Sequence, residues 1–267
     1  MPFVPADLNA AAYWAGNFVG GAVPPALADA AGNAWVPGTV NPPDHHFILP
    51  AGVGSHFSHH VGALQADHHR VVNFGALGAA NQSVFLEFYP NQITSCRLPA
   101  GGLVSYFFTA QLSGCAIFVD QLPAGDVIVY HANAMRFSLP QAQAQAQPLD
   151  YETPNAVNYL NALHAHARAH YPGAVNLGST FKSAYNAAVA TEAQRKRNQL
   201  RSNVDFVGGT SVFGFKVAGV WEFYYQTWGY VTYRRPFWKG LGDVAAGTNK
   251  QNAVGGPMRI FDVTQFV

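Results

Sequence analysis

The chain has 267 residues, and its 49% hydrophobic and 13% aromatic content is enough to build a substantial core. Only 11% of the residues are charged and the net charge is +1, which argues against a broad basic face for nucleic acid. No apolar run approaches the roughly 18 residues that a membrane-spanning helix needs. The first Lys or Arg is Arg70, so we expect no cleavable signal peptide and, for an exported protein, another route.

The first part of the chain differs in composition from the rest. Residues 1–44 are rich in Ala, Pro and Gly, and we expect a loosely structured arm with a short helix near Ala6–Ala12. Residues 45–267 are expected to form a single domain. Its first elements are four predicted strands, over Ser83–Tyr89, Leu103–Thr109, Ala116–Asp120 and Val127–His131.

Helical patterns occupy the middle of this domain. Gln141–Gln147 is a low-complexity Gln-Ala run that we interpret as a surface connection. Pro154–Tyr171 is predicted to be a helix capped by Thr153, and Phe181–Arg201 a second helix with a basic last turn. Thr210–Tyr233 is dense in β-branched and aromatic residues, which predicts two or three strands. Strands on both sides of a helical block, without regular βαβ alternation, indicate an α+β domain with a mixed sheet core.

The pairing of a cysteine with a histidine across a predicted hairpin is the strongest chemical signal. A turn at Leu122–Ala124 would pair Val119 with Val127 and place Cys115 directly opposite His131. Side chains opposite each other in an antiparallel pair have Cβ atoms about 4.5–5.5 Å apart, so the imidazole could take the thiol proton. The resulting ion pair would lower the cysteine pKa from about 8.5 into the reactive range. A slip of one residue would instead put the two side chains on opposite faces.

The residues before the cysteine suit the same chemistry. Ser113 and Gly114 are small and leave the approach to the sulfur unobstructed. Backbone N–H groups of this turn, at Ser113, Gly114 and Cys115, could hold the oxyanion of a tetrahedral intermediate. The segment therefore predicts a nucleophile, a base and an oxyanion site.

These residues also carry a family resemblance. Phe107–Thr109, then Leu112–Cys115, then a strand, turn and strand that end in His131, resemble the catalytic core of the Burkholderia lethal factor. The Leu-Ser-Gly-Cys element with its following His is similar to the deamidase domain of the cytotoxic necrotizing factors, and the Thr, Cys, His order to the chemoreceptor deamidase CheD. The match covers roughly Tyr106–Ala134, with a weaker echo from Val207–Gly209 into the aromatic strands near Trp221.

The resemblance implies a cysteine protein-glutamine deamidase with a mixed β-sandwich core flanked by helices. It assigns the nucleophile to Cys115, the general base and acid to His131 and a supporting polar group to Thr109, and it requires no cofactor. It further implies a bacterial toxin or effector, secreted or delivered without a cleavable signal peptide, that acts in the host cytoplasm. Its partner would be a host protein with a target glutamine, for example a Rho-type GTPase or a translation-initiation helicase. Transglutamination, with an amine in place of water, is a close variant.

Each of the two cysteines also has a structural interpretation. A cysteine on an apolar strand is usually a core residue, and this alternative stays open for Cys115. Cys96 has no paired histidine and is interpreted as structural. The chain has no disulfide framework, so we expect a reducing compartment. A disulfide between Cys96 and Cys115 would form only under oxidising conditions and would block the nucleophile.

Histidine pairs in the first 75 residues offer a second enzymatic hypothesis. Asp44–His46 and Asp67–His69 both spell the Asp-His-His triplet of a two-metal phosphoesterase family, and His56, His59 and His60 have the spacing of one helical face. The preceding carboxylate-rich motifs of that family are missing, and Asp and Glu number only 14. A metal-dependent phosphodiesterase or nuclease thus remains the alternative enzyme.

Two further clusters are not interpreted as functional sites. His164, His166 and His170 do not share one helical face well, and Arg195–Arg197 is interpreted as a solvated helix end. A third functional hypothesis is a non-catalytic binding module with the aromatic stretch Trp221–Trp238 as its contact surface.

Overall fold

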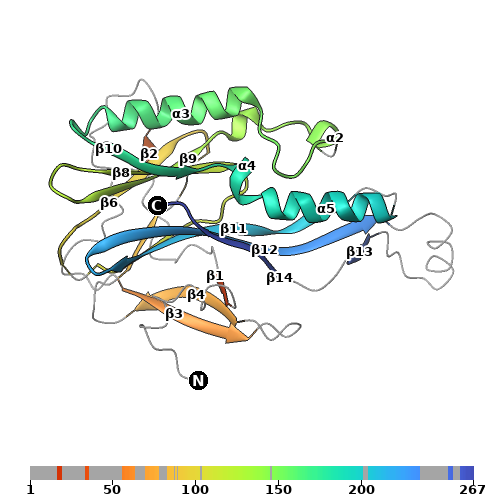
Figure 1. The fold of residues 1–267 in the computed structure, drawn as a ribbon, viewed down its shortest axis with the longest axis horizontal. Coiled ribbons are helices and arrows are strands. Elements are labelled where there is room, and N and C mark those ends of the chain that lie inside the picture. Colours follow the sequence, from red (N-terminus) through yellow and green to blue (C-terminus); the bar gives the residue numbers. More distant parts are fainter. Residues whose placement is uncertain are drawn as a thin grey trace.

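The hairpin that carries the predicted nucleophile and base lies at the centre of the fold (Figure 1). Its strands are β8 (Cys115–Gln121) and β9 (Val127–Asn133), both almost entirely buried. The computed structural model describes residues 17–19, 34–35, 56–63, 70–77, 83–86, 88, 90–102, 104–144, 146–200, 204–234, 252–254 and 259–267. Within these residues the protein is α+β, as the sequence predicts, with largely antiparallel sheets and few helices.

This hairpin is part of a five-stranded antiparallel sheet. Its order is β10-β8-β9-β6-β2, in which β10 is Val175–Thr180, β6 is Ile93–Leu98 and β2 is Ala34–Trp35. Neither β6 nor β10 is among the strands predicted from the sequence. We call this sheet the hairpin sheet.

A six-stranded sheet, which we call the long sheet, packs against one face of the hairpin sheet. Its order is β13-β12-β11-β7-β5, and β14 pairs with β12. The bounds are β5 Ser83–Leu86, β7 Tyr106–Thr109, β11 Val204–Val217, β12 Val220–Arg234, β13 Asn252–Val254 and β14 Arg259–Gln265. The predicted aromatic stretch is therefore a hairpin of two long strands, and β5 and β7 form a parallel pair.

Alternation along the strands builds two cores. Odd-numbered residues of β8 and β9, such as Ile117 and Val129, pack against Phe107, Val212 and Phe223 of the long sheet. Even-numbered residues face the opposite way and pack against helix α3 (Pro154–Arg168), which covers the outer face of the hairpin sheet (Figure 1). Because side chains alternate between the two faces of a strand, both faces of the hairpin are apolar and buried. This arrangement is a β-sandwich with a helical layer on one side.

The remaining elements lie at the edges of this sandwich. Helix α5 (Ala187–Leu200) packs Val189 and Ala193 against β11 and β12. A three-stranded sheet of β1 (Asn17–Val19), β4 (Arg70–Leu77) and β3 (His56–Ala63) lies beyond the long sheet (Figure 1). None of the helices in the described part of the chain is long and apolar enough to cross a membrane.

Several predicted elements need correction. Thr153 caps α3 as predicted, because its Oγ1 accepts the Ala156 N–H at 3.2 Å, but α3 ends at Arg168 rather than Tyr171. The second predicted helix is two helices, α4 (Lys182–Tyr185) and α5, separated at Asn186. The Gln-Ala run contains a single helical turn, α2 (Gln141–Ala144), and a 3₁₀ turn, η4 (Met135–Phe137), precedes it.

The N-terminal predictions are only partly covered by the structure. Strands β1 and β2 fall inside residues 1–44, and β2 pairs with β6 of the hairpin sheet. The histidines at 56, 59 and 60 lie on strand β3, so the helical spacing proposed for them is wrong. The predicted helix at Ala6–Ala12 and the two Asp-His-His triplets lie outside the described residues.

The hairpin between β8 and β9 has a different register from the predicted one. The Leu122 N–H donates to the Asp126 carbonyl at 2.8 Å, and the Gly125 N–H donates to the Leu122 carbonyl at 2.9 Å. Gly125 has φ of +90°, which a glycine adopts without strain. The loop is thus centred on Ala124 rather than Pro123. Cys115 consequently pairs with Asn133, and His131 pairs with Ile117.

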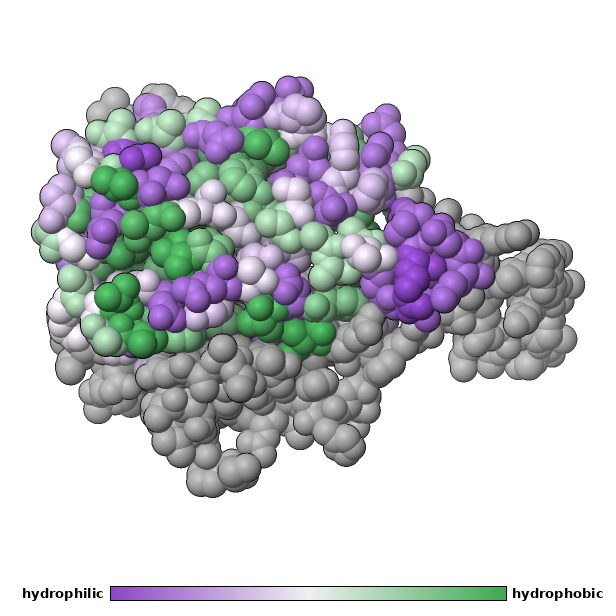
Figure 2. Space-filling view, in the orientation of Figure 1, coloured by the Kyte–Doolittle hydropathy of each residue, from purple (hydrophilic) through white to green (hydrophobic). Residues whose placement is uncertain are grey.

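Figure 2 shows hydrophilic and hydrophobic side chains interspersed over most of one face of the molecule. Hydrophilic ones gather around the far end of α5, where Arg195 forms an ion pair with Glu192 at 2.8 Å. Nearby, Arg197 donates to the backbone carbonyls of Gln147 and Val204. Both arginines therefore have partners within the chain.

Candidate active site

Cys115 is the first residue of β8 and follows a turn that requires glycine. Gly114 has φ of +150°, a backbone conformation that other residues rarely adopt. A Cβ at this glycine would meet no heavy atom within 4 Å, so open space adjoins the turn. The Leu112 N–H donates to the Thr210 carbonyl at 2.7 Å and fixes the turn to the long sheet. The Leu-Ser-Gly-Cys element thus connects the two sheets: Leu112 is bonded to the long sheet, and Cys115 begins β8 of the hairpin sheet.

His131 and Thr109 contact each other across the two sheets. Thr109 ends β7 in the long sheet, and its Oγ1 lies 2.6 Å from Nδ1 of His131 in the hairpin sheet. The same hydroxyl donates to the Ala110 carbonyl at 3.2 Å. Because a hydroxyl has one proton, Thr109 then accepts from Nδ1–H, which leaves the lone pair on Nε2. His131 Nε2 is buried and has no hydrogen-bond partner within the described part of the chain.

Cys115 and His131 lie on the same buried face of the hairpin sheet. Since Cys115 pairs with Asn133, the histidine is its diagonal neighbour, two residues back along β9. The correction to the register is an even number of residues, so it keeps both side chains on one face. Diagonal neighbours lie within reach of long and aromatic side chains. The predicted direct opposition of Cys115 and His131 is nevertheless wrong.

Asn133 occupies the position directly opposite the cysteine. Its Nδ2 donates to Cys115 Sγ at 3.1 Å. Phe88 covers His131 from another side, with ring centroids 5.6 Å apart. The site is therefore closed on several sides, and Cys115 is 1% and His131 0% exposed.

Burial sets the protonation of this group. Burial raises the pKa of the Cys115 thiol to about 11, although hydrogen bonds from Asn133 and the Ser113 backbone act to lower it. Burial lowers the pKa of His131 to about 3. Burial thus favours the neutral form of both groups and acts against the predicted thiolate–imidazolium pair. The reason is that burial opposes both charges and the offset register removes the direct contact that would compensate.

Tyr185 contacts the backbone around the cysteine. This fully buried tyrosine ends α4, and its hydroxyl donates to the Cys115 carbonyl at 3.3 Å. Burial raises its pKa well above the usual value, and backbone hydrogen bonds from Gly114 and Cys115 oppose that rise. These two N–H groups therefore face the phenolic oxygen. The Ser113 backbone forms a hydrogen bond with the sulfur of Cys115. The use of these backbone N–H groups as an oxyanion site stays a prediction.

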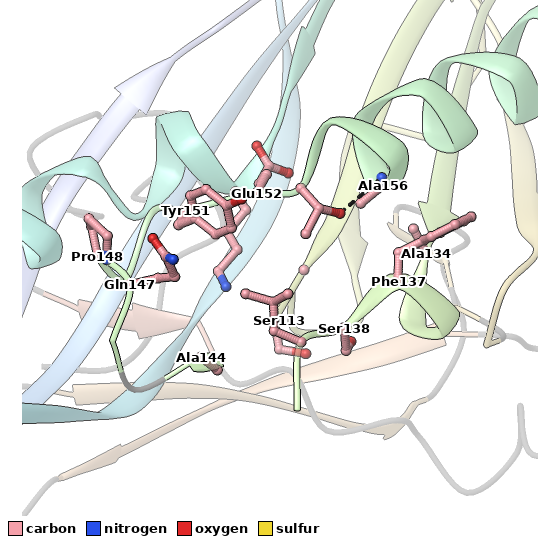
Figure 3. Close-up of a pocket in the computed structure, with 14 residues that line it drawn as sticks. Ser113, Ala134, Phe137, Ser138, Ala144, Gln147, Pro148, Tyr151, Glu152 and Ala156 are labelled. Atoms are coloured by element: carbon pink, nitrogen blue, oxygen red, sulfur yellow. Dashed lines mark hydrogen bonds between the residues drawn. The ribbon is translucent and has the colours of Figure 1, made fainter. Parts of the chain in front are cut away.

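A pocket of about 170 Å³ opens beside the turn before Cys115 (Figure 3). Ser113 lies between Phe137 and Ser138 on one side and Gln147 and Tyr151 on the other. Gly114 also lines it, so the pocket adjoins the residue that precedes Cys115.

The pocket contains one acidic and one basic side chain. Glu152 accepts the Ser183 N–H at 2.9 Å, and Lys182 also lines the pocket. Burial lowers the pKa of Lys182, whereas the nearby carboxylates of Glu152 and Asp150 act to raise it. Both charges lie within the pocket that adjoins Ser113 and Gly114.

Sequence reasoning missed Asn133, Tyr185 and the pocket. Asn133 could have been found, because it is two residues beyond His131 and must lie on the same strand face. Tyr185 and the pocket residues from 134 to 156 come from segments distant in sequence, and no local pattern links them to Cys115.

The other histidines of the middle region have structural contacts. His164 Nε2 lies 2.9 Å from Asp120, stacks on Phe118 and ties α3 to β8. Hydrogen bonds from His164 and Asn176 lower the pKa of the buried Asp120, although burial alone would raise it. Within the described ranges, no three His, Cys, Asp or Glu side chains gather as a metal site would require. The two cysteines are both free, with Cys96 buried on β6.

Comparison with known proteins adds no family. No family model matches the chain. No curated protein matches it either.

Proposed function

We propose that the protein is a cysteine-dependent hydrolase that deamidates a glutamine side chain on another protein. The observation that carries the proposal is the Thr109–His131 hydrogen bond of 2.6 Å, which orients a neutral imidazole on the same buried face as Cys115. A polar residue, a base and a thiol, here supplied by two packed sheets, are the groups that nucleophilic catalysis by a cysteine uses. The resemblance at Phe107–Thr109 and Leu112–Cys115 supports a glutamine carboxamide as the substrate group.

The reaction begins with a neutral thiol and a neutral imidazole. As the Cys115 sulfur attacks the carboxamide carbon, its proton passes to His131 Nε2, and the tetrahedral intermediate places negative charge on oxygen. The imidazolium then protonates the amide nitrogen, the C–N bond breaks and ammonia leaves a thioester. Water, deprotonated by His131, hydrolyses the thioester to glutamate and restores the thiol. The balance is one water consumed and one ammonia released.

The closed state constrains how the substrate enters. Because Cys115 is 1% exposed, the residues that cover the sulfur must move before a glutamine can reach it, and we place its approach at the pocket that Ser113 and Gly114 line. By resemblance, the protein is a bacterial toxin or effector in the host cytoplasm, with a Rho-type GTPase and a translation-initiation helicase as first candidate targets.

Heavy-oxygen water gives a direct test. The wild-type protein and Cys115→Ser are incubated with candidate host proteins in this solvent, and peptides are analysed by mass spectrometry. We expect a glutamine converted to glutamate with one solvent oxygen, and ammonia in equal amount, with the wild type only. Conversion by Cys115→Ser would contradict the proposal. So would a wild-type protein that converts no glutamine in any candidate protein or in host extract. A product joined to an added amine would indicate transglutamination instead.

A further inference from the structure

The orientation of the Asn133 carboxamide is fixed by its own hydrogen bonds. Its Oδ1 accepts two backbone N–H groups, from Asn91 at 3.0 Å and from Met135 at 2.9 Å. Both partners are donors, so the carboxamide atom that faces them must be the oxygen. The NH₂ group is thereby directed to the other side.

The NH₂ group of Asn133 faces the sulfur of Cys115. Asn133 Nδ2 lies 3.1 Å from Cys115 Sγ, and the two residues are direct partners across β8 and β9. Asn133 is only 7% exposed, so the contact is shielded from water. A hydrogen bond from a fixed donor to a sulfur becomes stronger as the sulfur gains charge, particularly in a dry site.

We propose that Asn133 is a further catalytic residue, whose Nδ2–H stabilises the Cys115 sulfur as its proton passes to His131. The catalytic role of Asn133 rests on the proposed function. Its contact with the sulfur rests only on the observed hydrogen bond. Two residues of β9 then have separate roles. His131 accepts the thiol proton, and Asn133 stabilises the negative charge that remains on the Cys115 sulfur. The Ser113 N–H faces the same sulfur and adds a second donor.

Two variants of Asn133 separate this role from a structural one. Asn133→Leu removes all its polar atoms at similar volume. Asn133→Asp keeps an oxygen acceptor for the Asn91 and Met135 N–H groups, replaces the donor to sulfur with an acceptor and adds a negative charge beside the sulfur. Asn186→Leu is the matched control, because this buried asparagine donates to the Leu149 carbonyl rather than to sulfur.

The readout is the ionisation of Cys115 itself. Thiolate absorbance in the ultraviolet is followed against pH, with Cys115→Ser as the blank that removes any signal from Cys96. A hydrogen bond to a charged group is strong enough that its loss should lower the thiolate fraction about ten- to a hundred-fold at pH values below the pKa. Iodoacetamide alkylation of Cys115 should slow by this factor in Asn133→Leu and by at least as much in Asn133→Asp, whose added charge also opposes the thiolate. It should stay unchanged in Asn186→Leu.

Activity measurements add a second signature. In Asn133→Leu, kcat should fall about ten- to a hundred-fold near neutral pH with little change in KM, and it should recover as the pH rises toward the pKa of the thiol.

Unchanged thiol titration and alkylation in both Asn133 variants would overturn the inference, even with an active wild type. A lower thiolate fraction in a protein that deamidates nothing would support the sulfur contact and reject the proposed function. Where neither variant folds, the Asn133 side-chain amide signal in wild-type protein should titrate with Cys115 and stop titrating in Cys115→Ser; a signal indifferent to that substitution would also overturn it.

Discussion

Acid should destabilise the protein through His131. This histidine is fully buried, and its pKa falls from 6.5 to about 3 on folding. Below pH 6.5 the unfolded chain binds a proton at this residue that the folded protein does not bind. The contribution of the neutral imidazole is therefore complete above pH 6.5 and is lost progressively as the pH falls toward 3.

The size of the effect follows from the gap between the two pKa values. Each pH unit in this window costs about 1.4 kcal/mol, so about 2 kcal/mol is lost by pH 5. For a chain of this length that corresponds to a fall in Tm of roughly 4–8 °C. The asparagine of His131→Asn cannot titrate, and its NH₂ group can still donate to Thr109, so the variant should lack this part of the acid sensitivity.

Thermal unfolding of both proteins at about pH 7.5 and about pH 5 measures the difference. We expect the wild type to lose about 2 kcal/mol more stability than His131→Asn over this interval. His170→Asn is the control, because it replaces an exposed histidine and should keep the wild-type pH response. Equal pH responses in wild type and His131→Asn would refute the conclusion that a buried neutral imidazole lies in the core.

The other predictions concern single contacts. Thr109→Val should lower kcat with little change in KM and cost about 1–3 kcal/mol, since the buried imidazole N–H loses its acceptor; wild-type turnover in this variant would contradict the orientation argued above. Gly114→Ala should destabilise the protein by about 1–3 kcal/mol through backbone strain, which denaturant unfolding measures, and a neutral result would mean that the turn does not need this φ. Asp120→Ala should cost about 1–3 kcal/mol because it leaves the buried His164 Nε2 without its hydrogen-bond partner, whereas a smaller loss would show that α3 is held mainly by apolar contacts. Deamidation should be unchanged in EDTA, and loss restored by manganese or zinc would favour the metal-dependent alternative.

The sequence by itself determined several features of the central hairpin. The apolar runs on both sides of the Pro-Ala-Gly turn specify two buried strands, and the two-residue period puts Cys115 and His131 on one face in any register that differs by an even number of residues. The cap at Thr153 was also predictable, because a threonine before a proline satisfies free N–H groups of the first helical turn. Even the correct register was available locally, since Gly125 is the residue of the turn best able to adopt a positive φ.

Only the tertiary structure decided what surrounds the cysteine. Thr109 meets His131 because two sheets pack face to face, and sequence separation carries no information on that contact. The protonation of the pair depends on how many layers cover it: with α3 on one side and the long sheet on the other, burial outweighs local hydrogen bonds and keeps both groups neutral. Asn133 acquires its orientation in the same way, since the N–H groups of Asn91 and Met135 come from segments before β6 and after β9 that the fold brings to one carboxamide. Periodicity specifies which face a side chain occupies, whereas packing between distant segments specifies what that face contacts.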